Sequence, residues 1–305
     1  MTKVFIDGSA GTTGLKIKER LLNRKDLSLI VLPDNLRKDI NAKKEAINSS
    51  DITFLCLPDE AAKEAVTLIE NQNTVVIDTS TAHRVDSAFT YGFPEVVGYE
   101  KIKASKKIAN PGCHASGFIA LIAPLVKNNL LNKNINLCCT SITGYSGGGK
   151  NMISSYEQMD NELYTAPRMY GLGQNHKHLK EMAFYTDLSN KPAFLPIVSN
   201  FYSGMQVTVP LFKEDLKGSI NDIKEIYKNT YNGKVVKFNG FADEEGFMSA
   251  KKLSNKDGME ISVGGNDERI ILTARYDNLG KGASGSAIQN MNIVLGLDET
   301  LGLIL

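Results

Sequence analysis

Apolar residues in the first hundred positions alternate between short continuous runs and stretches at helical spacing. The continuous runs predict buried strands at residues 3–7, 28–32, 52–57 and 74–77. The first two runs are separated by apolar residues near helical spacing, namely Leu15, Ile17, Leu21 and Leu22, and the last two by Ala61, Ala65, Leu68 and Ile69. Parallel strands joined by crossover helices produce this alternation. The pattern therefore predicts a Rossmann-like, doubly wound α/β domain at the start of the chain.

The pattern changes from about residue 136 onward. Longer strands are predicted at residues 137–143, 206–209 and 270–276, with fewer helices between them, which is typical of an α+β domain. Residues 283–303 return to helical spacing, with one apolar side formed by Ala287, Ile288, Met291, Val294 and Leu295. We expect the border between the two domains near residue 113.

Composition narrows the choice of function. The chain has 305 residues, and its 35 basic residues balance 34 acidic ones without a concentrated basic run, so we expect a small-molecule substrate and no nucleic-acid or membrane partner. Cysteines at positions 56, 113, 138 and 139 form neither a disulfide framework nor a CxxC pair. With no signal-peptide pattern and no apolar run of about 18 residues, the sequence predicts a cytoplasmic protein.

A glycine-rich turn, "GSAGTTG", follows the first predicted strand and opens the first helix. Backbone N–H groups of such a turn, together with the positive helix end, bind a pyrophosphate. The spacing is GxxGxxG rather than GxGxxG, and a tight strand-to-helix turn is the alternative interpretation. The context favours a dinucleotide site at Gly8, Ala10, Gly11, Thr12, Thr13 and Gly14.

The end of the second strand bears on the choice between NAD and NADP. There "LIVLPDNLRKD" places Asp34 near Arg37 and Lys38. An acidic residue at this place binds the ribose 2′-hydroxyl of NAD, whereas two cations can pair with the 2′-phosphate of NADP. We expect NADP bound by Arg37 and Lys38. In the alternative interpretation, both cations lie on a solvated surface loop.

The segment "IANPGCHASGFIALIAPLV" carries the main candidate for catalysis. Residues 110–112 form a predicted turn, and apolar residues at helical spacing follow Cys113. A cysteine at a helix N-terminus has a lowered thiol pKa, which supplies the thiolate that a nucleophile requires. The alternative is a buried packing residue, which is what we expect of Cys56, Cys138 and Cys139 within apolar strand patterns.

A thiolate that accepts an acyl group needs a partner for proton transfer, and the chain has four histidines. His83 lies in "TSTAHRV", and His114 is expected to point away from its neighbour Cys113. His176 and His178 remain, in "YGLGQNHKHLKEM", and on an extended segment they would face opposite sides. This HxH pair lacks a third ligand at metal spacing, so we expect an acid/base and no metal.

With these motifs in view, the chain resembles the short form of the N-acetyl-γ-glutamyl-phosphate reductases. The resemblance runs from "GSAGTTG" to the C-terminal helix. The other matching motifs follow in the family's order: "DTSTAHR", "YGFPEV", "NPGCHASG", "TGYSGGGK", "YGLGQNHKH", "GMQVTVPL" and "NLGKGASGSAIQNM". The chain departs from the family at Lys180, where the family commonly has proline, and this departure affects only the turn after His178.

The resemblance assigns roles to particular residues. It implies that Cys113 is the nucleophile and His176 the acid/base. Arg84 would bind the leaving phosphate. Three residues near His176 would line the substrate site: Tyr170, His178 and Glu181. Four more would contact the cofactor: Ser80, Gly282, Ala283 and Asn290.

The resemblance also implies an architecture in which the last helix returns to the cofactor domain. We therefore expect an NADP-binding domain at residues 1–113 plus 283–305 and a catalytic and oligomerisation domain at residues 114–282. The "TGYSGGGK" loop has enough glycine to fold around a ligand, and Lys150 or Arg168 would hold the substrate carboxylate. A homo-oligomer built through the second domain's sheet is implied as well.

The expected activity is the NADPH-dependent reduction of N-acetyl-γ-glutamyl phosphate to its semialdehyde in arginine biosynthesis, through a cysteine thioester. One alternative is a reductase of another acyl phosphate, such as aspartyl phosphate or carrier-linked aminoadipyl phosphate. A Cys-His acyl hydrolase without redox chemistry, or a non-catalytic NADP-binding sensor, are alternatives of different classes. The glycine turn argues against the hydrolase, and a sensor would not require Cys113.

Overall fold

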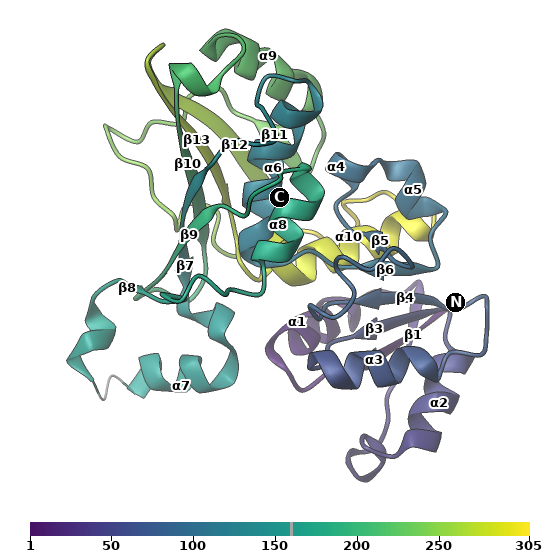
Figure 1. The fold of residues 1–305 in the computed structure, drawn as a ribbon. Coiled ribbons are helices and arrows are strands. Elements are labelled where there is room, and N and C mark those ends of the chain that lie inside the picture. Colours follow the sequence, from purple (N-terminus) through teal and green to yellow (C-terminus); the bar gives the residue numbers. More distant parts are fainter. Residues whose placement is uncertain (159–160) are drawn as a thin grey trace. The chain divides into compact units, whose positions relative to one another are not determined.

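The computed structural model describes residues 1–158 and 161–305, which divide into two compact units. The first unit comprises Met1–Pro111 and Ala283–Leu303, and the second comprises Gly112–Gly282 and Ile304–Leu305. In the described residues each unit is built around one sheet, of six strands in the first and seven in the second (Figure 1). The C-terminal helix thus belongs to the first unit, and the predicted fold class is confirmed.

The first unit has a parallel sheet in the order β2-β1-β3-β4-β6-β5. Its strands are β1 (Thr2–Asp7), β2 (Leu27–Ile30), β3 (Ile52–Leu55), β4 (Val75–Asp78), β5 (Thr90–Tyr91) and β6 (Lys107–Ala109). Its helices are α1 (Thr12–Leu21), α2 (Ile40–Ser49), α3 (Asp59–Thr67), α4 (Pro94–Val97), α5 (Tyr99–Lys103) and α10 (Gly285–Val294).

Alternating strand residues fill a separate core on each face of this sheet. Val4 and Ile6 of β1 pack with Ile17 of α1 and with Ile288 of α10. The intervening Phe5 points to the other face and packs with α2 and α3 side chains, including Ala46, Ile47 and Ala65. Helices on both faces require strands that are buried throughout, which explains their continuous apolar runs.

The helix predicted after the first strand is present as α1, but two features of this unit could not be read from the sequence pattern. Helix α1 buries Gly14, Ile17 and Leu21, whereas Leu15 is 42% and Leu22 61% exposed, because those two side chains lie outside the stripe that faces the sheet. Helix α2 was not predicted at all. It buries only Ala46 and Ile47, which is too weak an apolar pattern to identify a helix by periodicity.

The second unit has a mixed sheet in the order β11-β12-β13-β10-β7-β9-β8. Its strands are β7 (Cys138–Gly144), β8 (Arg168–Met169), β9 (Ala193–Ser199), β10 (Met205–Phe212), β11 (Val236–Phe238), β12 (Met259–Gly265) and β13 (Arg269–Tyr276). The pairs β7/β9 and β11/β12 are parallel, and the other neighbours are antiparallel.

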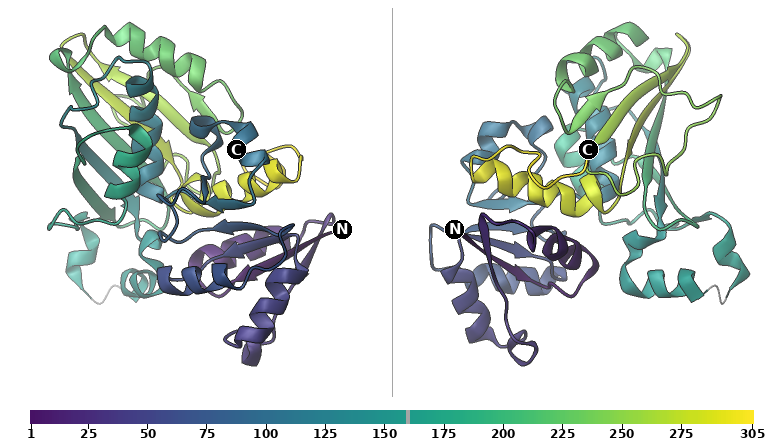
Figure 2. Two further views of the ribbon diagram at one scale, coloured as in Figure 1. Left: turned by 45° about the vertical axis from the view of Figure 1, so that its right-hand side comes forward. Right: turned by 180° about the vertical axis from the view of Figure 1, so that it is seen from behind.

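In residues 112–158 and 161–282 the second unit has four α-helices: α6 (Cys113–Lys127), α7 (Gly149–Gln158), α8 (Leu179–Thr186) and α9 (Ile220–Thr230). Helices α6 and α9 pack on the sheet, and α8 packs on α6. Helix α7 instead projects beyond the end of the sheet (Figure 2). In the described part of the chain, no helix is long and apolar enough to cross a membrane.

Candidate active site

The glycine-rich turn connects β1 to α1 in the first unit. Gly8 has a φ of 85°, and a Cβ at this position would lie 2.2 Å from the carbonyl oxygen of Cys56. A Cβ on Gly14 would lie 2.4 Å from the Gly8 oxygen. The turn itself therefore requires both glycines. Gly11 is exposed and is the N-cap of α1, so no side chain at residue 11 covers the free N–H groups at the start of this helix.

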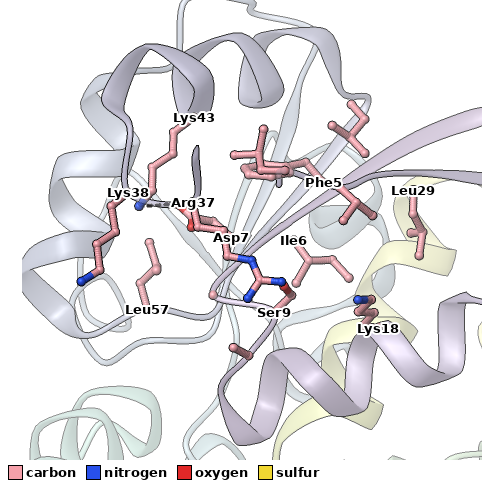
Figure 3. A pocket seen from close by; sticks show the side chains of 15 residues that line it. Phe5, Ile6, Asp7, Ser9, Lys18, Leu29, Arg37, Lys38, Lys43 and Leu57 are labelled. Atoms are coloured by element: carbon pink, nitrogen blue, oxygen red, sulfur yellow. Dashed lines mark ion pairs between the residues drawn. The ribbon is translucent and has the colours of Figure 1, made fainter. Parts of the chain in front are cut away.

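Beside the turn lies a cavity of about 270 Å³, bounded by residues 8–10 and by the end of β2. Four cationic side chains line it: Lys18, Arg37, Lys38 and Lys43. Lys38 and Lys43 lie on one side and Lys18 on the other (Figure 3). An apolar floor from β1 and β2 below several cations suits a nucleoside that carries phosphate. Arg37 and Lys38 thus line the cavity beside the glycine turn, on a segment that is also exposed to solvent.

The charges in this cavity are partly paired within the unit. Arg37 forms an ion pair with Asp34 at 2.7 Å, and Lys43 forms one with Asp7 at 3.2 Å. Burial raises the pKa of Asp7, although Lys43 opposes this effect. Sequence reasoning missed Lys43 and Lys18. Lys43 belongs to the unpredicted helix α2, so no signal in the sequence placed it beside the first strand.

The motif "DTSTAHR" follows β4 and forms a buried polar network. The fully buried Asp78 carboxylate accepts hydrogen bonds from the Ser80 backbone and hydroxyl at 2.9 and 2.7 Å, and His83 Nδ1 lies 2.7 Å from it. Arg84 is buried and donates to the carbonyls of Asn110 at 3.0 Å and Thr79 at 3.2 Å. The guanidinium is therefore held in place by backbone and does not lie on the surface.

Asn290 and Gly282 occupy different units. Asn290 is fully buried in the first unit, where its amide nitrogen donates to the Gly92 carbonyl at 2.9 Å. Asn110 donates to the Ala283 carbonyl at 3.0 Å, which ties the start of the C-terminal helix to the same unit. In the second unit, a Cβ on Gly282 would lie 3.0 Å from the Cys113 Cβ. Glycine at 282 thus permits close backbone approach to the candidate nucleophile.

Cys113 is the first residue of α6, as predicted, and is half-buried. The start of this helix is fixed from two sides. Glu181 accepts a hydrogen bond from the Gly112 backbone at 3.2 Å, and the Tyr276 hydroxyl donates to the Cys113 carbonyl at 2.5 Å. The positive end of a helix favours the thiolate.

The other cysteines of known surroundings differ from Cys113. Burial raises the pKa of Cys56 to about 12 and also raises the pKa of Cys139, so both thiols stay protonated at neutral pH. Cys138 is half-buried next to Cys139 on β7. These environments agree with packing roles.

Three histidine rings gather near the start of α6 in the second unit. The centroids of His176 and His178 lie 4.7 Å apart, and the His114 ring lies 5.6 Å from the first and 5.5 Å from the second. One prediction was wrong here: His176 and His178 do not face opposite sides, because both rings belong to the same cluster.

The local backbone explains why His176 and His178 do not face opposite sides. Residues 177–178 form a turn into α8 and not an extended segment, and the His178 N–H donates to His176 Nδ1 at 3.2 Å. Glu181 lies one helical turn further, with Oε1 4.0 Å from His178 Nε2. His178 and Glu181 are buried whereas His176 is half-buried, so His176 is the more accessible of the pair. Among the described residues, no group of histidine, cysteine or acidic side chains is arranged to hold a metal ion.

His114 and Ser141 are polar residues of this cluster that sequence reasoning did not identify. His114 Nδ1 lies 2.7 Å from the Ser141 hydroxyl, and Nε2 lies 2.7 Å from the Tyr170 hydroxyl. Burial, and then the charge of His176, lower the pKa of His114 to about 3. Ser141 comes from β7, which no motif linked to residue 114.

The two cations expected at the substrate carboxylate lie in different environments. The Arg168 guanidinium stacks on the Tyr164 ring, 4.3 Å from its centroid, and donates to the Tyr156 hydroxyl at 2.9 Å. Lys150 is exposed in the first turn of α7. Arg168 lies two residues before Tyr170 and is held in a defined orientation by these contacts. Lys150 is exposed instead.

The sequence matches two family models. Residues 32–105 match the semialdehyde dehydrogenase NAD-binding domain, and residues 113–278 match the semialdehyde dehydrogenase dimerisation domain. The chain is 40% identical to N-acetyl-gamma-glutamyl-phosphate reductase 2 of Nostoc sp., over 99% of each chain. It is 41% identical to the N-acetyl-gamma-glutamyl-phosphate reductase of Brucella ovis, over 96% of this chain and 99% of that one.

Solved structures with the same fold are more distant in sequence. Aspartate semialdehyde dehydrogenase II of Vibrio cholerae, complexed with ASA, superposes with a TM-score of 0.71 at 16% identity, over 97% of this chain and 98% of that one. The aspartate semialdehyde dehydrogenase of Francisella tularensis gives a TM-score of 0.69 at 16% identity, over 97% and 100%. At this identity the likeness shows the fold alone.

Proposed function

The chain belongs to the N-acetyl-γ-glutamyl-phosphate reductase family, and we propose that it is the NADPH-dependent enzyme that reduces N-acetyl-γ-glutamyl phosphate to N-acetylglutamate 5-semialdehyde and phosphate. This is a step of arginine biosynthesis, and we place it in the cytoplasm. The observation that carries the proposal is Cys113 at the start of α6, in the same unit as the cluster of His176, His178 and Tyr170. Acyl transfer to cysteine requires a thiolate nucleophile and a group, here His176, that can exchange a proton with the bound acyl group.

The first unit binds a nicotinamide cofactor, and we infer that the cofactor is NADP. The cavity beside the glycine turn fits this group, because it combines an apolar floor with four cationic side chains. The N-terminal N–H groups of α1 would receive the pyrophosphate. Arg37 and Lys38 would receive the 2′-phosphate, with Lys43 beside them.

In the proposed reaction, the Cys113 thiolate attacks the γ-acyl carbon of the substrate. The new carbon–sulfur bond forms as the carbon–oxygen bond to phosphate breaks, so phosphate leaves and a thioester remains on Cys113. The thioester would be reduced by the hydride that NADPH supplies when it is bound in the cavity of the first unit. His176 donates a proton to the oxygen that becomes negative, and it takes this proton back as the carbon–sulfur bond breaks, which releases the aldehyde and the Cys113 thiolate.

The substrate's charges select the remaining residues. We assign the leaving phosphate to Arg84, because its guanidinium is held by backbone carbonyls and needs no reordering. We assign the substrate carboxylate to Arg168, since its stacked guanidinium is pre-oriented and Lys150 is not. His178 and Glu181 support the loop that carries His176.

A homo-oligomer fits the sheet of the second unit. Side chains along β7, β9 and β10 alternate between buried and partly exposed, because the helices of this unit cover only one face. The other face includes the exposed Ile271, at 46%. The match to a dimerisation domain over residues 113–278 supports association through this sheet face.

A phosphate-dependent oxidation assay tests the proposed function in the reverse direction. Purified protein would receive N-acetylglutamate semialdehyde, phosphate and NADP, and NADPH formation would be followed by its absorbance. We expect turnover that requires phosphate and is much faster than with aspartate semialdehyde. Equal or greater turnover of aspartate semialdehyde would contradict the proposed substrate, and hydrolysis of an acyl donor without any change in cofactor would indicate a Cys-His hydrolase.

A further inference from the structure

His114 is a buried histidine with hydrogen bonds on both ring nitrogens, and the mechanism above does not use it. It lies in the first turn of α6, beside Cys113, and is 3% exposed. Because burial lowers its pKa to about 3, the ring is neutral near pH 7. A neutral imidazole has one nitrogen that donates and one that accepts, so its tautomer decides the direction of both hydrogen bonds.

Ser141 determines which nitrogen carries the proton. Its side chain is fully buried on β7, and within residues 1–158 and 161–305 its hydroxyl has a single hydrogen-bond partner, His114 Nδ1 at 2.7 Å. A buried hydroxyl that kept its proton unbonded would lose stability, so Ser141 donates to Nδ1. Nδ1 is then the unprotonated acceptor, and the proton of His114 is on Nε2.

The protonated Nε2 faces the Tyr170 hydroxyl at 2.7 Å and donates to its oxygen. The phenol proton cannot then point at His114 and is directed elsewhere. Burial, and then the charge on Cys113, raise the pKa of Tyr170, so this hydroxyl keeps its proton. The Tyr170 backbone donates to the Pro196 carbonyl at 3.0 Å, which fixes the residue at the end of β8.

We propose that His114 is a positioning residue, which through its Nε2 proton makes the Tyr170 hydroxyl a hydrogen-bond donor to negative charge at Cys113. This inference rests on the proposed role of Cys113 as nucleophile. With the opposite tautomer, Tyr170 would donate to His114 and present only lone pairs to the thiolate, which would repel it. The chain Ser141–His114–Tyr170 therefore sets the sign of the electrostatic effect of Tyr170 on the nucleophile.

The tautomer is measured directly by long-range ¹H–¹⁵N correlation of imidazole signals in histidine-labelled protein. The chain has four histidines, so the missing signals of a His114→Gln variant identify His114. We expect its proton on Nε2 and no titration between about pH 6 and 9. A proton on Nδ1, or a ring that titrates in this range, would overturn the proposal.

The consequence for Cys113 is measured by its rate of alkylation with iodoacetamide as a function of pH. Loss of a hydrogen bond to a charged group should raise the midpoint by about 1–2 pH units in Tyr170→Phe. His114→Phe should give a similar rise, because Tyr170 then lacks the donor that orients it. His114→Gln, whose amide replaces the Nε2 donor, should restore part of the wild-type midpoint.

A double variant separates positioning from a general loss of structure. If His114 acts only through Tyr170, the variant His114→Phe/Tyr170→Phe should have the same midpoint as Tyr170→Phe alone. Tyr202→Phe, which removes a phenol on the same unit, serves as the control and should leave the midpoint unchanged. Additive shifts in the double variant, or an unchanged midpoint in Tyr170→Phe, would contradict the proposal.

Neither measurement requires substrate or cofactor. If the protein failed to oxidise N-acetylglutamate semialdehyde but gave the expected tautomer and alkylation shifts, the proposed function would fail and the positioning role of His114 would stand. Normal turnover together with a proton on Nδ1 would support the proposed function and contradict the positioning role of His114.

Discussion

The cofactor cavity of the first unit and the histidine cluster of the second, formed by His114, His176 and His178 with Ser141 and Tyr170, are built in different ways. The cavity depends on backbone: Gly8 and Gly14 are required by a turn of one short segment, and helix α1 begins within it. The histidine cluster depends on side chains from α6, from β7, from the residue after β8 and from the turn before α8, which are distant in sequence. We therefore expect substitutions in the cofactor cavity to alter cofactor binding and substitutions at Cys113 and in the cluster to alter turnover.

The largest effect should come from Cys113→Ser. A serine hydroxyl at this position is not ionised and is a far poorer nucleophile than a thiolate, so turnover should fall to background. NADPH binding, measured by fluorescence titration, should stay within about twofold of wild type, since the cavity is formed by the first unit alone.

Iodoacetamide labelling provides the matched control for this variant. Cys113 should be alkylated fastest in the wild type, because burial keeps Cys56 and Cys139 protonated. Preferential labelling of one of the other cysteines, or near-normal turnover by the serine variant, would remove Cys113 from the mechanism.

The next largest effect should come from His176→Asn. Loss of a general acid/base should lower kcat by roughly 10²–10⁴-fold and flatten the acidic limb of the pH–rate profile, with little change in cofactor binding. His178→Asn should act differently. Because His178 is buried and lies near Glu181, its loss should destabilise the loop and raise KM as well as lower kcat.

Chelation distinguishes this assignment from a metal site. EDTA should leave the wild-type rate unchanged, whereas a metal held by His176 and His178 would make both variants equally inactive and activity dependent on added zinc. Retention of most of the turnover by His176→Asn would contradict its role as acid/base.

The difference between the two units also explains how far the sequence alone could lead. In the first unit β1 to β4, the glycine turn and the two cations near the end of β2 were predictable, because each depends on neighbours in the sequence, whereas the short strands β5 and β6 were not predicted. Lys43 was not, since α2 buries too little apolar surface to show its periodicity. The start of α6 at Cys113 was predictable for the same local reason.

The side-chain cluster could be predicted only as a set of motifs. The ring contacts of His114 depend on how β7, β9 and β8 pair, and no local pattern specifies the parallel register of β7 with β9. The predicted orientation of His178 relative to His176 was wrong, because the turn before α8 brings both histidines to one side. The sequence thus predicted which residues would carry the chemistry, but it did not predict which of them are in contact.

Acid should destabilise the protein through a buried histidine of the second unit. The folded protein protonates His114 only near pH 3, whereas the unfolded chain does so near 6.5. Below pH 6.5 the unfolded state therefore binds more protons, and the free energy of unfolding falls as pH falls, by up to about 1.4 kcal/mol per pH unit.

Urea unfolding between about pH 4 and 8 measures this slope. His114→Gln, which cannot take up a proton, should be less stable than wild type at pH 8 but should lose less stability on acidification. The same slope in both proteins would mean that His114 is not the group responsible.

The smallest effect should come from the cations of the first unit. Arg37→Ala together with Lys38→Ala removes two charges that line the cofactor cavity, and only NADPH carries a 2′-phosphate for them to meet. Arg37 is 42% exposed and already paired with Asp34, so solvent screens its interaction and the preference for NADPH over NADH should fall by only about tenfold. The observable is the ratio of the two dissociation constants, and in wild type this ratio should decrease as salt is added.

Lys44→Ala is the matched control, because Lys44 pairs with Glu70 outside the cavity lining. Alkylation of Cys113 should be the same in all three proteins if the two units divide their tasks as proposed. An unchanged ratio in the double variant would move the 2′-phosphate site to other residues, with Lys43 as the first to test, and a slower alkylation of Cys113 would show that the division between the units is incomplete.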